Sequence, residues 1–270
     1  MAKNKLVTPF VKWVGGKRQL MNSIMEVMPK NIRNYTYVEP FIGGGAVLFH
    51  IQPKNAIIND FNTELINVYN VVKENLDKNE SEYFYHIRSL DRSEDFARIG
   101  KIQRASRLIY LNKTCYNGLY RVNNAGEFNS PFGRYKNPNI VNEPALRAVS
   151  SYLNSNNVHI FSGDYYDILK DLDRNSFVYL DPPYHPISES SNFTGYIQGG
   201  WNIFDQARLR EACDELTKRG VKFLLSNSAS GFIKDQYRNY NIITVKAIRS
   251  INVDTTKRGE VDELLIRNYE

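Results

Sequence analysis

The stretch YTYVEPFIGGGAVLFH, residues 35–50, joins an apolar and aromatic run to three consecutive glycines and a second apolar run. The first run predicts a buried strand, and the second predicts the start of a helix. Glycines at positions 43–45 allow a sharp turn between them, because glycine adopts positive φ angles without steric cost. A strand that leads through a turn into a helix opens a βαβ unit, so this stretch predicts an α/β fold.

Further strand and helix patterns extend this unit on both sides. A helix is predicted from Leu20 to Met28, where Pro29 ends it, and another from Thr63 to Leu76. A third helix is predicted from Asp205 to Arg219, before Gly220. The remaining strand patterns are AIIND (56–60), VHIFSGD (158–164), FVYLDPPY (177–184), VKFLLSNS (221–228), IITVKAI (242–248) and ELLIRNY (263–269).

The region from residue 62 to residue 147 differs from its flanks. It contains helical patterns and a polar loop, NGLYRVNNAGEFNSPFGRYKNP (117–138), but no strand pattern. The sequence therefore predicts one sheet domain built from residues 1–61 and 148–270, interrupted by a mostly helical insertion at 62–147.

Composition limits the class of protein. The chain has 270 residues, 42% of them hydrophobic, which is enough for a large packed core. It has no run of about 18 apolar residues that would span a membrane, and its start, MAKNKLVTPF, lacks a signal-peptide pattern. We therefore expect a cytoplasmic protein. Two isolated cysteines and four scattered histidines predict neither a disulfide framework nor a metal site.

Positive charge is concentrated in one segment. The whole chain carries a net charge of +6, whereas residues 98–147 contain nine Lys or Arg and two Glu, a balance of +7. Tyrosines, phenylalanines and asparagines alternate with these cations, a mixture typical of contact with phosphates and bases. A solvated helix face with ordinary loop aromatics is the alternative.

The stretch FVYLDPPYHP, residues 177–186, places an aspartate directly after an apolar run and before two prolines. Proline cannot continue the strand because it lacks a backbone N–H, so Asp181 lies at the strand's carboxyl end. Ligands bind at that edge of open α/β sheets. Asp181 is therefore a candidate for chemistry, and a solvated turn aspartate is the alternative.

Asp60 follows Gly43 by 17 residues, at the end of the next predicted strand. This spacing resembles the dinucleotide fingerprint, in which an acid about 20 residues after the glycines binds ribose hydroxyls. The pattern G-x-G-x-x-G itself is absent, which leaves other adenosine-containing cofactors open. WVGGKRQ (13–19) fails the P-loop pattern, because Val11 and Arg18 occupy two of its required positions.

Together these motifs resemble the Dam-type DNA adenine-N6 methyltransferases over nearly the whole chain. The resemblance rests on FVKWVGGKRQL (10–20), EPFIGGG (39–45) with Asp60, YNGLYRVNNAGEFNSPFGRY (116–135), DPPY (181–184) and RSINVDTTKRGEVDELL (249–265). It implies a Rossmann-like sheet, S-adenosylmethionine as methyl donor, double-stranded DNA as substrate, usually at GATC, and target recognition by the insertion. It leaves open whether a restriction endonuclease accompanies the protein.

The resemblance also implies site residues. The carboxylate of Asp181 and the carbonyl of Pro182 would accept the two N6 hydrogens of a flipped-out adenine, on which Tyr184 would stack. The residues implied at the cofactor are Trp13, Lys17, Phe41, Gly43, Gly45, Asp60, Asp164 and Asp181. Those implied at DNA are Lys12, Tyr116, Asn117, Leu119, Arg121 and Pro131. Asn192, Phe193 and Tyr196 are expected to close over the base.

Three alternatives remain at this point. The same acceptor pair would serve another planar amine, such as cytosine N4, RNA adenine or a glutamine amide. A DNA-binding protein with an inactive cofactor pocket would not need Asp181, Asp60 and the glycine turn together. A nucleotide-dependent oxidoreductase would be expected to carry the full glycine fingerprint.

Overall fold

The computed structural model describes residues 3–74, 84–93, 96, 98–123, 125–136, 138–186, 201–248 and 260–270. The predicted closing residues Asn192, Phe193 and Tyr196, and residues 249–259 of the last family motif, lie outside these ranges. Within them, no helix is long and apolar enough to cross a bilayer. The same ranges contain no group of three or more His, Cys, Asp or Glu arranged to hold a metal ion.

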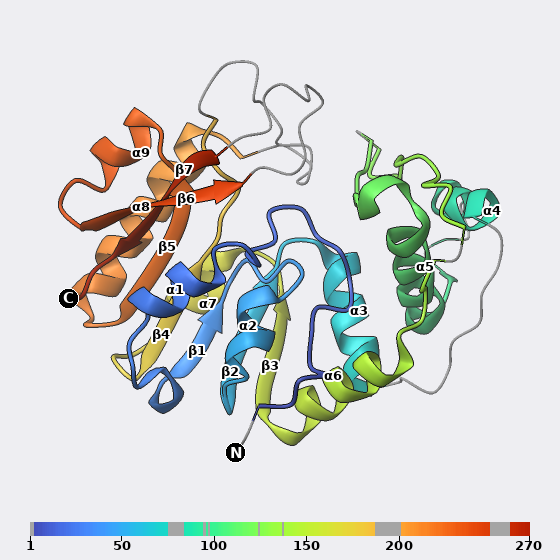
Figure 1. The fold of residues 1–270 in the computed structure, drawn as a ribbon, viewed down its shortest axis with the longest axis horizontal. Helices are drawn as coiled ribbons and strands as arrows, with labels where there is room; N and C mark the ends of the chain where they lie inside the picture. Colours follow the sequence, from blue (N-terminus) through green and yellow to red (C-terminus); the bar gives the residue numbers. More distant parts are fainter. Residues whose placement is uncertain are drawn as a thin grey trace. The chain divides into compact units, whose positions relative to one another are not determined.

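The strands form a mixed sheet in the order β3-β2-β1-β4-β5-β7-β6 (Figure 1). β1 pairs with β4, β4 with β5, and β2 with β3 in parallel, whereas β7 runs antiparallel to both β5 and β6. This topology confirms the predicted α/β class with a Rossmann-like sheet. The strand bounds are β1 Thr36–Glu39, β2 Asn55–Asp60, β3 Asn157–Ser162, β4 Ser176–Leu180, β5 Lys222–Ser228, β6 Asn241–Ile248 and β7 Glu260–Arg267.

The chain divides into two compact units. The first contains the described residues between 3 and 16 and between 42 and 164, and the second contains those between 17 and 41, 165 and 186, and 201 and 270. The helical elements of the first unit are α2 (Ala46–Ile51), α3 (Thr63–Glu74), α4 (Phe84–Ser89), η2 (Leu90–Arg92), α5 (Lys101–Thr114), η4 (Tyr116–Gly118) and α6 (Glu143–Ser155). Those of the second are α1 (Met21–Val27), η1 (Ile32–Asn34), α7 (Tyr165–Leu169), α8 (Ile203–Lys218) and α9 (Gly231–Gln236).

Helix α3 is the centre of the first unit. It packs against α5 and α6 and against strands β2 and β3. Leu65, Tyr69 and Val72 recur at helical spacing and are buried, which explains why this helix covers the strands with one face. In the described part of residues 62–147, the only β pairings are two isolated bridges, Cys115 with Phe132 and Val122 with Phe128, in agreement with the expected lack of strands.

Strand β4 lies in the core of the second unit. All five of its residues are buried, as expected for a central strand paired on both sides. Helix α8 packs on β5 and begins with a capping box in which Asn202 and Asp205 satisfy each other's backbone N–H groups. The predicted helix at Asp205–Arg219 is thereby confirmed to within two residues.

Candidate active site

The glycine turn of the first unit has a conformation that only glycine adopts readily. Gly43 and Gly45 have φ angles of +48° and +69°. A Cβ atom on Gly45 would lie 2.6 Å from the hydroxyl of Tyr69 and 2.8 Å from the ring of Phe49. The turn is held by hydrogen bonds from the Ile42 N–H to the Asn59 carbonyl and from the Tyr69 hydroxyl to the Gly43 carbonyl. The turn therefore needs small residues for packing as well as for backbone angles.

Trp13 lies against this turn. A Cβ atom on Gly43 would lie 3.0 Å from Cδ1 of the indole, and one on Gly44 would lie 3.2 Å from the Trp13 Cβ. The indole also stacks on Tyr120, with ring centroids 5.2 Å apart. The structure therefore brings together three residues predicted at the cofactor, Trp13, Gly43 and Gly45.

Asp60 ends strand β2 and binds the turn directly. Its Oδ2 accepts a hydrogen bond from the Gly43 N–H at 3.0 Å, and its Oδ1 accepts one from the Asn62 N–H at 2.9 Å. Burial raises the pKa of the Asp60 carboxyl, and these two backbone donors partly oppose the shift. Each carboxylate oxygen has a second lone pair, so Asp60 can hold the turn and still accept from a ligand hydroxyl.

Asp164 lies two residues beyond the end of β3, the neighbour of β2. Asp60 pairs with Ser162 in the parallel register, and the Gly163 N–H donates to the Asp60 carbonyl at 3.2 Å. The side-chain amide of Asn59 donates to the Gly163 carbonyl at 3.0 Å. Asp60 and Asp164 thus lie at the carboxyl ends of adjacent parallel strands, the edge at which α/β proteins bind ligands.

In the second unit, Asp181 directly follows the buried strand β4. Its Oδ1 lies 2.8 Å from Nζ of Lys17, whose exposed fraction is only 7%. Burial raises the pKa of the Asp181 carboxyl, the Lys17 ammonium lowers it, and Glu263 raises it further. Asp181 is therefore a desolvated acceptor whose ionised form depends on a neighbouring cation.

Tyr184 is fixed at its hydroxyl and at its ring. The hydroxyl donates to Oε2 of Glu263 on β7 at 2.8 Å, and the Lys17 ammonium lies 4.7 Å from the ring centroid. Burial and the neighbouring carboxylates raise the pKa of Tyr184 well above its usual value, so the phenol stays protonated. The structure thus brings Lys17, Asp181 and Tyr184 together, and it adds Glu263, which the sequence analysis did not identify.

A second group that the sequence analysis missed holds the backbone after Asp181. The buried Gln206 side chain donates to the Pro183 carbonyl at 2.9 Å, and Asn227 donates to Gln206 at 3.2 Å. Asn227 also accepts from the His185 N–H at 3.1 Å, and the Ser228 hydroxyl donates to the His185 carbonyl at 2.6 Å. The Ser-Asn-Ser sequence at the end of the apolar run 221–228 could have predicted this group, because buried polar residues need hydrogen-bond partners.

Phe41, the remaining residue predicted at the cofactor, belongs to an aromatic cluster of the second unit. Its ring centroid lies 5.1 Å from that of Tyr165 and 5.6 Å from that of Trp201. The Trp201 ring meets it edge-on at an interplanar angle of 86°, a favoured aromatic geometry.

The predicted DNA-binding residues lie around the turn at η4. Lys12, Tyr116 and Asn117 are exposed, and Asn117 adopts a positive φ of 54°. The buried side chain of Asn112 joins this turn to the N-terminal segment, because it donates to the carbonyls of Lys12 and Gly118 and accepts from the Lys12 N–H.

Residues 119–123 and 125–132 continue from this turn as the two sides of a hairpin, which the bridge between Val122 and Phe128 joins. Arg121 lies on the hairpin surface, and its Nε and Nη2 donate to the side chain and carbonyl of Asn129 at 2.7 Å and 3.3 Å. Pro131 is exposed and accepts from the Tyr116 N–H, whereas Leu119 is half-buried. Arg121 and Pro131 therefore both lie on the surface of this hairpin.

The basic segment carries less free charge than its sequence suggests. Among the described residues, Arg104 pairs with Glu64, Arg107 with Asp91, and Arg147 with Glu143. Burial lowers the pKa of Arg107, and the Asp91 carboxylate opposes that shift. Arg98, Lys101, Arg121, Arg134 and Lys136 are exposed. The exposed cations of the segment therefore lie on the hairpin, on the loop after it, and just before and at the start of α5.

Comparison with known proteins identifies one family over most of the chain. The family model for the D12 class of N6 adenine-specific DNA methyltransferases matches residues 13–251. The chain is 41% identical to Type II methyltransferase M1.LlaDCHI of Lactococcus lactis, an alignment that covers 100% of this chain and 98% of the relative. It is 42% identical to Type II methyltransferase M.MjaIII of Methanocaldococcus jannaschii, covering 97% and 99%. It is 35% identical to the DNA adenine methylase of Escherichia coli, covering 98% and 95%.

Proposed function

Because this chain belongs to the D12 class of N6 adenine-specific DNA methyltransferases, we propose that it takes its methyl group from S-adenosylmethionine and places it on the adenine of GATC. Transfer of a methyl group to adenine N6 in DNA is the activity of the family, which excludes an oxidoreductase. The activity of the family also favours adenine in DNA as the methyl acceptor over cytosine N4, RNA adenine or a glutamine amide. GATC rests on the resemblance to Dam-type enzymes.

The observation that supports this assignment most directly is the environment of Asp181. Adenine N6 is a poor nucleophile because its lone pair is delocalised into the ring. The Asp181 carboxylate and the Pro182 carbonyl would accept the two N6 hydrogens and localise that lone pair. The Lys17 ammonium, 2.8 Å from Oδ1, favours the ionised carboxylate that this role requires.

The residues around the glycine turn fit an adenosine-containing methyl donor. S-adenosylmethionine supplies an electrophilic methyl group on a sulfonium centre when it is bound. The Asp60 carboxylate would accept hydrogen bonds from ribose hydroxyls, as acids at this position do in dinucleotide-binding folds. Gly43 and Gly45 carry no side chain between the backbone of the turn and a ligand, which permits close approach to that backbone. Trp13, Lys17, Phe41 and Asp164 are proposed as further donor-binding residues.

Tyr184 is proposed as the stacking partner of an extruded adenine. An enzyme cannot reach N6 inside a stacked duplex, so the base must leave the helix at a cost of about a few kcal/mol. An aromatic face returns part of that free energy, because base–aromatic stacking contributes about 1–3 kcal/mol. The hydrogen bond from Tyr184 to Glu263 fixes the ring in advance.

Residues 62–147 are proposed as the target-recognition insertion, with Lys12, Tyr116, Asn117, Leu119, Arg121 and Pro131 at DNA. Support comes from the exposed cations and aromatics of this region, since phosphate contacts position a protein on DNA and base contacts specify the site. The Type II names of two relatives support a cognate restriction endonuclease in the same system. A DNA substrate agrees with the predicted cytoplasmic location.

The test of this function is methyl transfer from labelled S-adenosylmethionine to duplexes with and without GATC. We expect N6-methyladenine in the GATC duplex alone after hydrolysis of the product. A 2-aminopurine at the target position should gain fluorescence as the base leaves the stack. Equal labelling of both duplexes would contradict the proposed target, and turnover without a fluorescence change would contradict base extrusion.

Arg121→Ala is expected to relax sequence discrimination rather than to weaken binding uniformly. The guanidinium has five N–H donors, and its bonds to Asn129 orient it while leaving others for a guanine edge. Discrimination at one G·C pair should fall by about 1–3 kcal/mol, measured as kcat/KM on GATC duplexes with single substitutions.

The control is Lys136→Ala, which removes another exposed cation of the same segment. It should weaken binding to all duplexes alike and lower the slope of log K against log salt by about one unit. If Arg121→Ala gives this uniform pattern instead, Arg121 contacts phosphate and does not read a base.

Lys17→Gln is expected to shift the acid limb of the pH–rate profile to higher pH. Catalysis needs ionised Asp181, and burial already raises the pKa of that carboxyl. Loss of the ammonium removes the group that lowers this pKa, so the carboxyl is protonated at a higher pH and activity is lost earlier on acidification. Lys170→Gln is the control, because Lys170 pairs with Asp167 on the surface. An unchanged acid limb in Lys17→Gln would show that Lys17 does not tune Asp181.

A further inference from the structure

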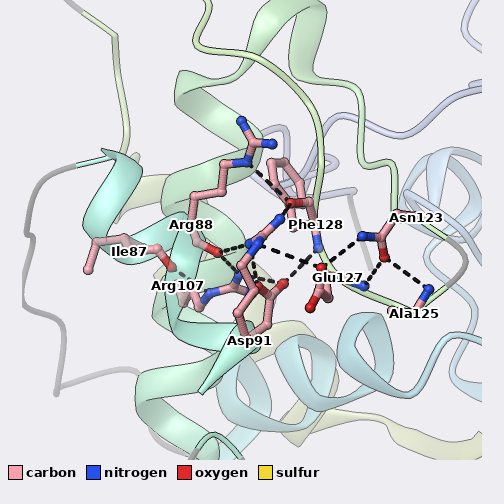
Figure 2. A network of polar contacts seen from close by, with 9 residues as sticks. Ile87, Arg88, Asp91, Arg107, Asn123, Ala125, Glu127 and Phe128 are labelled. Atoms are coloured by element: carbon pink, nitrogen blue, oxygen red, sulfur yellow. Dashed lines mark hydrogen bonds and ion pairs between the residues drawn. The ribbon is translucent and has the colours of Figure 1, made fainter.

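The hairpin that carries Arg121 is attached to the rest of the first unit at Phe128. The N–H of Phe128 donates to Oδ2 of Asp91 at 2.7 Å, and its carbonyl accepts from Arg88 at 3.2 Å and Arg92 at 2.9 Å (Figure 2). The ring is buried and meets Tyr120 edge-on, with centroids 5.7 Å apart. These contacts therefore fix the N–H, the carbonyl and the side chain of Phe128.

Asp91 is itself held by two arginines. Its Oδ2 lies 2.7 Å from Nη2 of Arg107, and its Oδ1 lies 2.8 Å from Nη1 of Arg92. The exposed fractions of the Asp91 and Arg107 side chains are 8% and 9%, so their pairing is shielded from water. Arg107 also donates to the carbonyls of Ile87 and Arg88 at the end of α4. The carboxylate thus joins α5 to the hairpin, and its partner Arg107 also binds the end of α4.

The path from Asp91 to Arg121 is short: the Asp91 carboxylate binds the Phe128 N–H, and the next residue, Asn129, binds Arg121. Asn129, which follows Phe128, donates its N–H to the Arg121 carbonyl and accepts the Arg121 guanidinium with its side chain. A shift of Phe128 would move Asn129, and with it the group that orients the guanidinium. Bidentate contact with a base edge tolerates little misplacement, because both N–H groups must meet their acceptors at once.

We propose that Asp91 is a positioning residue for target recognition, which fixes the Phe128–Asn129 segment so that Arg121 is oriented to read a base before DNA binds. This inference rests on the proposed base-reading role of Arg121. A buried carboxylate with two arginine partners suits this task, because charge-assisted hydrogen bonds are short and directional. Orientation in advance lowers the cost of ordering the side chain on binding.

Asp91→Asn tests the proposal, since it keeps the shape but replaces one of the two acceptor oxygens with an amide that cannot accept. The readout is the ratio of kcat/KM for the GATC duplex to that for each singly substituted duplex. This ratio is independent of the amount of folded enzyme, so a purely structural role would not change it. We expect discrimination to fall about tenfold, at the same base pair at which Arg121→Ala acts.

Glu143→Gln is the matched control, because it removes one acidic charge of the same unit from an exposed pair with Arg147. Its ratios should equal those of the wild type. The double variant Asp91→Asn/Arg121→Ala should discriminate no worse than Arg121→Ala alone, because Asp91 acts through Arg121. If Asp91→Asn does not fold, Arg92→Gln serves in its place, since Arg92 is one-third exposed and bonds both Asp91 and Phe128.

Unchanged ratios in a folded Asp91→Asn or Arg92→Gln variant would overturn the proposal, as would a loss at base pairs that Arg121→Ala does not affect. Failure of the underlying function has a different signature. In that case Arg121→Ala itself leaves discrimination unchanged, whatever Asp91→Asn does.

Discussion

Asp181→Asn is expected to lower kcat by about 100- to 1000-fold while DNA and methyl-donor binding persist, because it removes the preorganised charged acceptor that we propose for the reacting amine. Asparagine has nearly the shape of aspartate, but it is neutral and offers only one acceptor oxygen. The lone pair of N6 then stays delocalised in the transition state, whereas ground-state contacts elsewhere are kept. The measurement is single-turnover methyl transfer at saturating donor and DNA.

Unfolding of the variant has to be separated from loss of catalysis in this experiment. Lys17 and Asp181 are both shielded, and breaking a buried ion pair by removing one partner costs about 3–5 kcal/mol. Part of any activity loss could therefore come from unfolding, so rates must be expressed per folded enzyme, with the melting temperature recorded. Asp181→Ala should also lower kcat, and it should lower the free energy of unfolding more than Asp181→Asn does. Asp167→Asn, on the surface of the same unit, is the control. A folded Asp181→Asn enzyme with wild-type kcat would contradict the mechanism.

Local patterns predicted the parts of the site that depend on neighbours in sequence. The glycines at 43–45 were expected because a strand must turn into a helix there, and the structure gives Gly43 and Gly45 positive φ angles. Asp60 and Asp181 were placed at strand ends because an apolar run stops at each of them, and β2 and β4 end where expected. The positions of these turns and strand ends follow from hydrophobic periodicity and from the backbone conformations that proline and glycine favour.

Long-range partners could not be predicted in this way. Lys17 meets Asp181 across more than 160 residues of sequence. Tyr184 meets Glu263, 79 positions away, because strands β4, β5 and β7 are neighbours in the sheet and not in sequence. Arg107 appeared in the sequence as part of a basic surface, yet it is buried against Asp91. A charge pattern fixes how many cations a segment has, but tertiary contacts decide which of them remain free for DNA.

Asp60→Ala is expected to weaken methyl-donor binding by about 10- to 100-fold, measured as the dissociation constant of S-adenosylmethionine by calorimetry. A hydrogen bond to a charged group contributes about 1.5–3 kcal/mol, and Asp60 is proposed to make such bonds to the ribose. The variant also removes the acceptor of the Gly43 and Asn62 N–H groups, so the turn that we propose to bind the donor loses its support.

The matched control is Asp173→Ala, because Asp173 likewise accepts from the N–H two residues on, at 2.9 Å from Asn175, but belongs to the second unit, in the segment before β4. An unchanged dissociation constant in Asp60→Ala would refute the assigned role.

Because burial raises the pKa of the Asp60 carboxyl, donor binding by the wild type should weaken as the pH falls through that raised value, and Asp60→Ala should lose this dependence. A ribose contact is made equally in the ground and transition states, so kcat at saturating donor should change little. Asp60→Ala and Asp181→Asn therefore separate donor binding from chemistry.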